Sequence, residues 1–307
     1  MSTGPASGRL TEEHVFRAGT LADDPWSLRL TPEHAGWTYT GLAVVDLPAG
    51  GQVDFGTADA EACALPLSGH GVVVECEGKV VELEGRGGVF EGPSDFAYLP
   101  RDAEVRVRAA EASRIAFPSA RCARRLPVRH VPRADVPVEL RGAGNCSRQV
   151  HNFCAAGVFE ADNLIAVEVL TPGGNWSSYP PHKHDEDVPG EESVLEEIYY
   201  FEVAGPPRDG GGTGDAAHGI GYQRVYGERD RPIDVLAEVG SGDAVCMPHG
   251  WHGPSMAAPG YDLYYLNVMA GPGPERAWLI RDDPAHAWVR DTWADQPVDP
   301  RLPFGRA

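Results

Sequence analysis

The chain consists of short apolar runs separated by clusters of Gly, Pro, Asn and Asp, with little helical periodicity between them. Glycine and proline are abundant, at 37 and 27 of the 307 residues, and they supply the turns that short strands need. Strands this short, at this density, are typical of a sandwich or barrel and not of βαβ units. We therefore predict an all-β protein, with strands in the runs Thr38–Leu47, Gly71–Cys76, Val80–Leu83, Phe96–Leu99, Val105–Ala109, Leu164–Leu170, Ile198–Val203, Tyr222–Tyr226, Ala244–Met247 and Tyr261–Met269.

Two segments share a pattern that indicates a diverged repeat. Asp95–Pro100 and Asp243–Pro248 each read as an acidic turn, a short apolar strand and a proline. A chain of 307 residues is long enough for two domains, and the proline-containing stretch Arg124–Arg141 is suited to join them. We predict two β-barrel domains, residues 1–140 and 141–307.

Histidines and a glutamate in the second half form the most informative pattern. His182 and His184 are two positions apart, so on a strand their side chains point to the same face. Glu197 opens an apolar run, and His252 ends the sequence Pro-His-Gly-Trp-His. Imidazoles with one carboxylate suit a divalent ion such as zinc, nickel, manganese or ferrous iron. The first half has no His-x-His, and Glu104 stands where the repeat would place the last histidine, so we expect one metal ion, in the second domain only.

The carboxylate ligand is either Glu196 or Glu197, because adjacent residues of a strand face opposite sides of the sheet. We favour Glu197, which lies closer to the apolar run Ile198–Phe201. In that register Tyr199 also points into the barrel. Glu196 stays open as the alternative ligand.

This arrangement resembles the two sequence motifs of the cupin superfamily. The first motif is His-x-His followed by Glu, and the second is Gly, five residues, Pro-x-Gly and then His. Gly242, Pro248 and Gly250 match the second motif, although His252 arrives one position early. The gap between the first two histidines and the glutamate is longer than usual, and residues 185–192 read as an insertion. The resemblance implies two cupin (jelly-roll-like) β-barrel domains, of which the first is degenerate.

Longer segments resemble one family in particular, the 5-deoxy-glucuronate isomerase family of inositol breakdown. The similar segments are residues 161–184, 195–200 and 260–271, and the likeness covers most of residues 152–290. It implies a metal-dependent bicupin aldose–ketose isomerase that converts 5-deoxy-D-glucuronate to 5-dehydro-2-deoxy-D-gluconate. It also implies a small-molecule sugar-acid substrate, a homo-oligomer and a cytoplasmic location.

The implied reaction moves a proton from C2 to C1 of an open-chain sugar, so a base must lie within hydrogen-bond reach of that proton. Glu168, on the run Leu164–Leu170 that precedes the site, is one candidate for this base. Tyr199 is the other.

The carboxylate of such a substrate calls for a guanidinium, which offers a planar bidentate fork. Arg224 shares a strand face with Tyr222, and the two bind substrate if that face is inward. The opposite orientation, in which they are ordinary solvated strand residues, is weighted equally. Trp176 has the same parity as His182 and is a candidate for the pocket lining. If the face of Arg224 points outward, the arginine that binds the substrate carboxylate is to be sought among Arg148, Arg276 and Arg281.

Composition excludes several other classes. A net charge of −19 argues against a nucleic-acid partner, because phosphate binding needs a basic footprint. No run approaches eighteen consecutive apolar residues, and the first 25 residues lack the apolar core of a secretory signal. The six cysteines show no CxxC spacing and are expected to be reduced thiols of a cytoplasmic protein.

Three rival functions remain. An oxygen-dependent bicupin, a dioxygenase or decarboxylase, would use iron or manganese on the same ligands. A related uronate isomerase of pectin breakdown would differ in substrate only. A non-catalytic sugar-binding cupin would have lost its ligands, which is true of the first half of this chain and not of the second.

Overall fold

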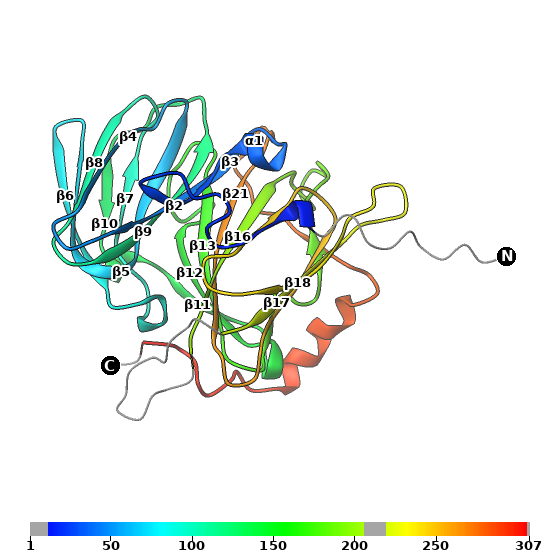
Figure 1. Ribbon diagram of the computed structural model, residues 1–307. Coiled ribbons are helices and arrows are strands. Elements are labelled where there is room, and N and C mark those ends of the chain that lie inside the picture. The colour runs from blue at the N-terminus through cyan, green and yellow to red at the C-terminus, as the bar shows by residue number, and fades with distance from the viewer. Residues whose placement is uncertain (1–11, 206–218, 306–307) are drawn as a thin grey trace.

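The computed structural model describes residues 12–205 and 219–305, which form two β-lobes lying side by side (Figure 1). Almost all regular structure in these two ranges is strand, and the α-helix that they contain, α1 (Pro32–Ala35), is one turn long. The all-β prediction is therefore confirmed. None of the helices in the described ranges is long and apolar enough to cross a membrane.

The N-terminal lobe is one nine-stranded antiparallel sheet that closes on an apolar interior. Its strands alternate as expected for a half-buried surface, and β8 buries Val105, Val107 and Ala109 while the residues between them face solvent. The interior is filled by Val, Leu, Ala and Phe side chains. The strands are β2 (Trp26–Leu30), β3 (Thr40–Leu47), β4 (Gln52–Gly56), β5 (Ala60–Cys76), β6 (Lys79–Arg86), β7 (Phe96–Leu99), β8 (Glu104–Ala109), β9 (Ser113–Arg121) and β10 (Arg129–Val131).

The C-terminal lobe encloses a barrel between two sheets. The seven-stranded sheet has the order β1-β19-β16-β21-β13-β12-β11. Its strands are β1 (Val15–Phe16), β11 (Val138–Arg141), β12 (Arg148–Cys154), β13 (Ile165–Thr171), β16 (Glu196–Val203), β19 (Ala244–Met247) and β21 (Leu263–Ala270). The six-stranded sheet contains β14 (Trp176–Ser177), β15 (His182–Lys183), β17 (Gly221–Tyr226), β18 (Asp234–Val239), β20 (Trp251–Ala257) and β22 (Arg281–Asp282).

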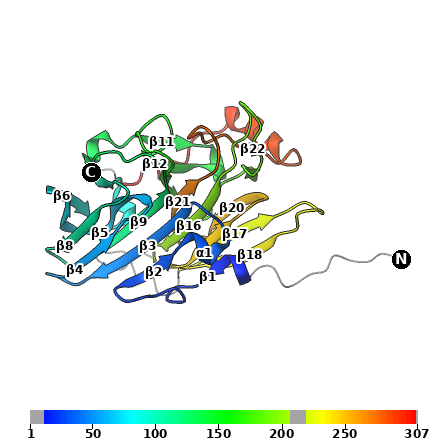
Figure 2. The same cartoon turned by 90° about the horizontal axis from the view of Figure 1, so that it is seen from above.

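The inner strands of the seven-stranded sheet, such as β13 and β21, are buried on both faces. Tyr199 and Phe201 point into the barrel core, whereas Ile198 and Tyr200, which alternate with them, belong to a second apolar cluster shared with the N-terminal lobe. Figure 2 shows β3 of the N-terminal lobe beside β16 and β21 at this junction. Residues on the outer face of the sheet are consequently buried without being near the barrel interior.

The chain crosses between the lobes at residues 131–138. β10 pairs with β7 in the N-terminal lobe, while β11 pairs with β12 in the C-terminal lobe. The N-terminal end of the chain does not follow this division, because β1 pairs with β19 of the C-terminal lobe. The boundary between residues 140 and 141 stays a prediction.

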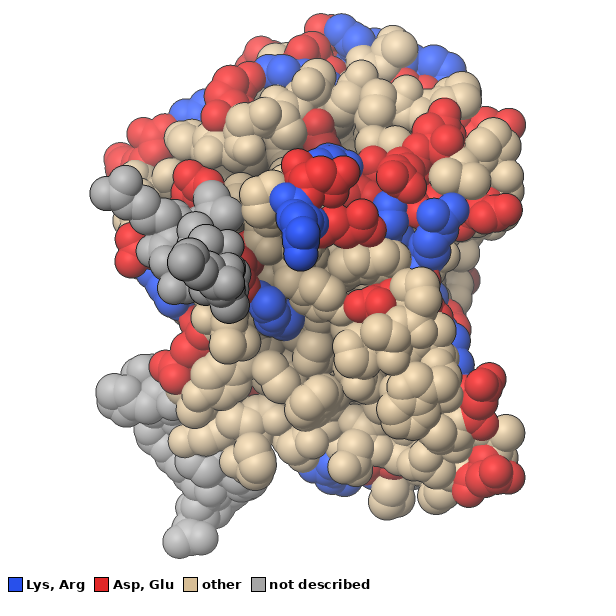
Figure 3. All heavy atoms as spheres, turned by 90° about the vertical axis from the view of Figure 1, so that its right-hand side faces the viewer, with Lys and Arg blue, Asp and Glu red and all other residues tan. Residues whose placement is uncertain are grey.

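The surface is predominantly acidic but mixed. On the face drawn in Figure 3, Asp and Glu side chains gather over the upper half with Lys and Arg among them, and much of the lower half is uncharged. This face carries no broad basic patch of the kind that nucleic-acid binding requires.

Candidate metal centre

Buried histidines and a glutamate meet inside the C-terminal barrel. Ligand atoms of His184, Glu197 and His252 all lie within 4.8 Å of one another. The Nε2 atoms of His252 and His184 are 2.9 and 3.2 Å from a carboxylate oxygen of Glu197. His182 is the direct cross-strand partner of His252, and their ring centroids are 4.4 Å apart. The structure thus brings the four predicted residues together, with three in mutual contact and the fourth beside them.

Hydrogen bonds on the outer nitrogens determine which atoms face the cluster. The Nδ1 atoms of His182, His184 and His252 lie 3.3, 3.2 and 3.5 Å from backbone carbonyl oxygens. A carbonyl oxygen only accepts, so in these bonds each Nδ1 carries the proton. Each Nε2 is then left with a lone pair directed into the barrel, which is the tautomer that binds metals. The accepting carbonyls belong to Pro180, Leu195 and Gly250.

This donor set fits a divalent metal ion. Two nitrogen lone pairs facing a carboxylate repel it unless a cation or proton lies between them. Oε1 of Glu197 and Nε2 of His252 are also buried without a hydrogen-bond partner. Imidazole nitrogens and one carboxylate match the ligands of first-row divalent ions.

The two candidate glutamates point in opposite directions. The carboxylate of Glu196 accepts hydrogen bonds of 2.7–2.8 Å from the backbone N–H groups of Thr38, Tyr39 and Thr40 in the N-terminal lobe. It therefore ties the two lobes together on the outer face of β16. Glu197, fully buried, faces the histidines.

Three hydroxyl groups lie next to the cluster. Ser178 Oγ is 2.9 Å from the hydroxyls of both Tyr199 and Tyr265, whose rings stack with centroids 4.3 Å apart. The Tyr199 ring lies 6.3 Å from that of His252. Burial, and then the charge of Glu197, raise the pKa of Tyr199 well above its ordinary value. Tyr199 therefore points into the barrel, but its hydroxyl stays protonated and is suited to donate a hydrogen bond, whereas the sequence suggested it as a base.

Two amide side chains complete this interior, and the sequence reasoning missed both. Gln223 is fully buried on β17, accepts a hydrogen bond from Ser255 and approaches the sulfur of Met247 at 3.8 Å. Asn267 on β21 is the cross-strand partner of Tyr199, and its Oδ1 is buried without a partner. Strand parity was the signal that could have found Gln223, because it lies between Tyr222 and Arg224 and points to the opposite face of the strand.

The prediction that Arg224 and Tyr222 bind substrate is wrong, because their strand face is outward. Along β17 the odd-numbered residues are buried and the even-numbered ones are half-exposed. Arg224 forms an ion pair with Asp234, and Tyr222 donates a hydrogen bond to Glu238 at 3.1 Å. Both contacts lie on the outer surface of the six-stranded sheet, between β17 and β18.

Glu168 is also misplaced by the sequence reasoning. Its carboxylate is buried on the outer face of β13, where it pairs with Arg86 of the N-terminal lobe. It also accepts hydrogen bonds from His151 Nδ1 and the Tyr264 hydroxyl, both at 2.8 Å. The inward residues of this strand are Val167 and Val169. Glu168 is therefore part of the junction between the lobes and does not reach the metal centre.

Trp176 lies at the surface, with 41% of its area exposed, and packs edge-on against Tyr179. The parity argument failed because Ser178 has a left-handed backbone conformation, with φ of +47°. Such a residue interrupts strand alternation, so positions on its two sides need not share a face.

The three remaining arginines differ in their partners. Arg276 donates to three backbone carbonyls and so holds a loop in place. Arg281 is half-buried and pairs with glutamates of the insertion, including Glu192 at 3.3 Å. Arg148 on β12 is buried and is within 3.1 Å of the carbonyl of Cys146.

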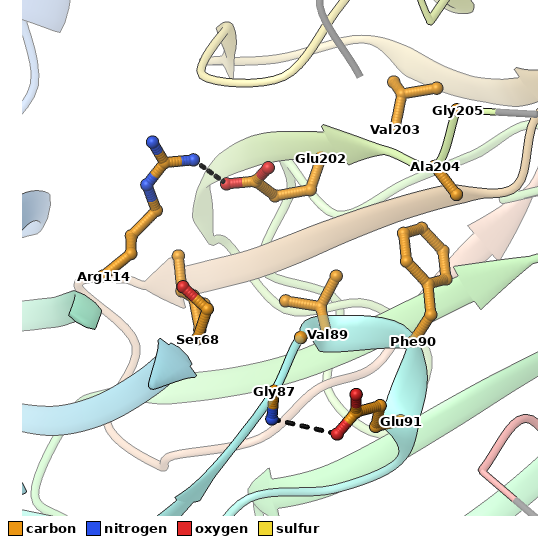
Figure 4. A pocket seen from close by; sticks show the side chains of 12 residues that line it. Ser68, Gly87, Val89, Phe90, Glu91, Arg114, Glu202, Val203, Ala204 and Gly205 are labelled. Atoms are coloured by element: carbon orange, nitrogen blue, oxygen red, sulfur yellow. Dashed lines mark hydrogen bonds and ion pairs between the residues drawn. The ribbon is translucent and has the colours of Figure 1, made fainter. Parts of the chain in front are cut away.

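A separate crevice of about 180 Å³ opens between the lobes, on the outer face of β16 (Figure 4). Ser68, Val89 and Phe90 line one side. On the other side Arg114 bonds to Glu202 at 2.9 Å and to Asp46 at 2.7 Å. These charged groups satisfy one another, and the crevice has no contact with the histidine cluster.

Two β-barrels in one chain, with histidines and a glutamate gathered inside the second, define a bicupin. Solved structures agree with this class. Oxalate decarboxylase of Lactobacillus farciminis superposes with a TM-score of 0.60 over 91% of this chain and 90% of its own, at 10% identity, which speaks for the fold alone.

Sequence comparisons identify one family within this fold class. The model of the KduI/IolB family matches residues 14–289, so the chain belongs to that family. It is 41% identical to the 5-deoxy-glucuronate isomerase of Geobacillus thermodenitrificans over 86% of this chain and 91% of that protein. The enzyme of the same name from Bacillus subtilis is 37% identical, with 85% and 91% covered. The crystal structure of an IolB-like protein from Salmonella typhimurium superposes with a TM-score of 0.80 at 35% identity, covering 92% and 99%.

Proposed function

We propose that this protein is a metal-dependent isomerase that converts 5-deoxy-D-glucuronate to 5-dehydro-2-deoxy-D-gluconate in myo-inositol catabolism. The observation that carries the proposal is the buried cluster of His184, Glu197 and His252, with nitrogen lone pairs aimed at one carboxylate and hydroxyl groups beside it. The relatives named for this activity support the choice of substrate. Six free cysteines fit a cytoplasmic location, and we expect a homo-oligomer.

His182, His184, Glu197 and His252 would hold one divalent ion. Such an ion would supply a Lewis acid for the substrate carbonyl and positive charge where negative charge develops during isomerisation. Zinc, manganese, iron and nickel all suit these ligands. The insertion supports the ligands from outside, because buried Lys183 bonds to Asp185 at 2.7 Å and to Glu192 at 3.1 Å.

Tyr199 is the proposed catalytic side chain of the barrel. Because its hydroxyl stays protonated, it would donate a hydrogen bond to a substrate oxygen as negative charge builds there. Ser178 orients that hydroxyl and links it to Tyr265. Gln223 and Asn267 would bind further hydroxyl groups of the sugar chain, for which amides are suited as both donors and acceptors.

A turnover assay tests the reaction. The purified protein, loaded with each candidate metal, is incubated with 5-deoxy-D-glucuronate and with the uronate of pectin breakdown, and ketose formation is followed by NMR. We expect turnover of the first substrate without oxygen or nicotinamide, and loss of activity with a chelator. Oxygen consumption coupled to substrate loss would favour the oxygenase reading, and turnover of the pectin uronate alone would favour the sister isomerase.

The adjacent glutamates provide a matched pair for the metal. Glu197→Gln should lose most of the bound metal, measured by elemental analysis, because it removes the charged ligand. Glu196→Gln should retain the metal, since its side chain binds the backbone of Thr38–Thr40. Equal metal content in the two variants would contradict the ligand assignment.

A further inference from the structure

Arg148 is a buried cation without an acidic partner among the residues that the structure describes. Only 8% of its surface is exposed. Its guanidinium contacts the carbonyl of Cys146 at 3.1 Å and the ring of Trp293, whose centroid is 5.5 Å from the guanidinium carbon. A buried charge is costly unless a counter-charge compensates it. A site that retains such a cation is therefore suited to an anionic ligand.

The position of Arg148 on β12 directs it to the barrel side of the sheet. Gln149 and His151 lie on the opposite face, where they bond to each other and His151 bonds to Glu168 at the lobe junction. Val150, two positions after Arg148, belongs to the barrel core. Parity places Arg148 on the face of Val150, which is also the face of Tyr265.

Arg148 is electrically close to the hydroxyls beside the metal centre. Burial, followed by the neighbouring cations Arg141 and Arg290, lowers its pKa, while Tyr265 acts in the opposite direction. Contacts therefore lead from the His252 ring through Tyr199 and Ser178 to Tyr265, which lies on the same face of the sheet as Arg148.

The other two arginines of this region have their own carboxylates. Arg141 pairs with Glu139 at 2.8 Å, and Arg290 forms two contacts with Asp282. They raise the positive potential around Arg148, and because each already has a carboxylate partner, neither competes with Arg148 for an anionic ligand. Among these three arginines, Arg148 is therefore the one whose charge is available to an anionic ligand that enters the barrel.

We propose that Arg148 binds the substrate carboxylate on the barrel side of β12, and thereby selects a uronate over a neutral aldose. This inference rests on the proposed function, because it assumes a sugar acid whose other end is held at the metal centre. Arg148 replaces Arg224 in that role. A guanidinium binds a carboxylate through two parallel hydrogen bonds, which positions the sugar chain as well as attracting it.

The test compares two substrates that differ only in charge. One is 5-deoxy-D-glucuronate, and the other is 5-deoxy-D-glucose, which carries a hydroxymethyl group in place of the carboxylate. In Arg148→Met we expect kcat/KM for the uronate to fall by about 10- to 100-fold, with the neutral aldose affected much less. Arg224→Met, which removes an outward arginine, is the matched control and should leave both values near wild type.

A second measurement tests carboxylate binding by Arg148 separately from the isomerase reaction. Calorimetric titration of the metal-loaded proteins with 5-deoxy-D-glucuronate should show weaker binding for Arg148→Met by a similar factor. If wild type binds but does not turn over, and the variant loses binding, the clamp stands and the proposed reaction fails. If wild type turns over and Arg148→Met treats both substrates as wild type does, the clamp is overturned and the reaction stands. Should the methionine variant not fold, Arg148→Lys is used, and an unchanged preference for the uronate would count against the fork.

Discussion

The substitution Glu168→Gln distinguishes a structural from a catalytic role for the carboxylate that sequence reasoning placed in the active site. Glu168 and Arg86 come from different lobes, and their side chains are 1% and 0% exposed. The pair is further bonded to His151 and Tyr264. Glutamine has nearly the same shape but removes the negative charge, so Arg86 is left buried without a counter-charge.

The expected cost follows from two independent estimates. Breaking a buried ion pair by changing one partner costs about 3–5 kcal/mol. Burial alone would raise the pKa of Glu168, but Arg86 and then His151 outweigh it and lower the pKa from 4.5 to about 2. A depression of that size corresponds to about 3 kcal/mol of the free energy of unfolding near neutral pH. In a chain of this size the melting temperature should fall by about 5–8 °C.

The assay measures melting temperature, metal content and kcat at 25 °C on the same preparation. We expect Glu168→Gln to melt lower while its metal content and kcat stay near those of wild type. Glu202→Gln serves as control, because its ion pair with Arg114 is partly exposed and should contribute about 1 kcal/mol or less. A loss of kcat by about a thousandfold with an unchanged melting temperature would refute the structural assignment and restore Glu168 as a base.

Further predictions concern metal binding, the outer sheet face and acid stability. His252→Ala should reduce the metal content from about one ion per chain to a small fraction of that, measured by elemental analysis, because it removes a ligand of the cluster. Arg224→Ala should keep kcat/KM within about twofold of wild type, since its ion pair with Asp234 lies on the surface. Because the folded pKa of Glu168 lies below its unfolded value, its stabilisation is complete above about pH 4.5 and is lost as the pH falls toward 2. Melting curves over that range should decline more steeply for wild type than for Glu168→Gln, and parallel curves would contradict this.

Much of the architecture was predictable from local pattern. Strand runs such as Val105–Ala109 and Ala244–Met247 coincide with or overlap observed strands, because alternation and turn residues are local properties of the sequence. The candidate ligands His182, His184 and His252 were also found from spacing alone, and they converge because cupin-like motifs occur on neighbouring strands.

What the sequence left open was the direction in which particular faces point. Every residue of β13 is buried, so apolarity could not distinguish the barrel side from the side that packs on the N-terminal lobe. Glu168 is buried because the other lobe covers it, and that contact joins segments 82 residues apart.

The same limit applies to the substrate-binding residues. The sequence by itself determined that Tyr222 and Arg224 share one face of a strand and that Gln223 lies on the other. Only the tertiary structure decided that the face of Gln223 is inside, because that depends on how β17 pairs with β18 and β20 to close the barrel. Alternation along a strand is a local consequence of backbone geometry, whereas the inside of a barrel exists only once distant strands have met.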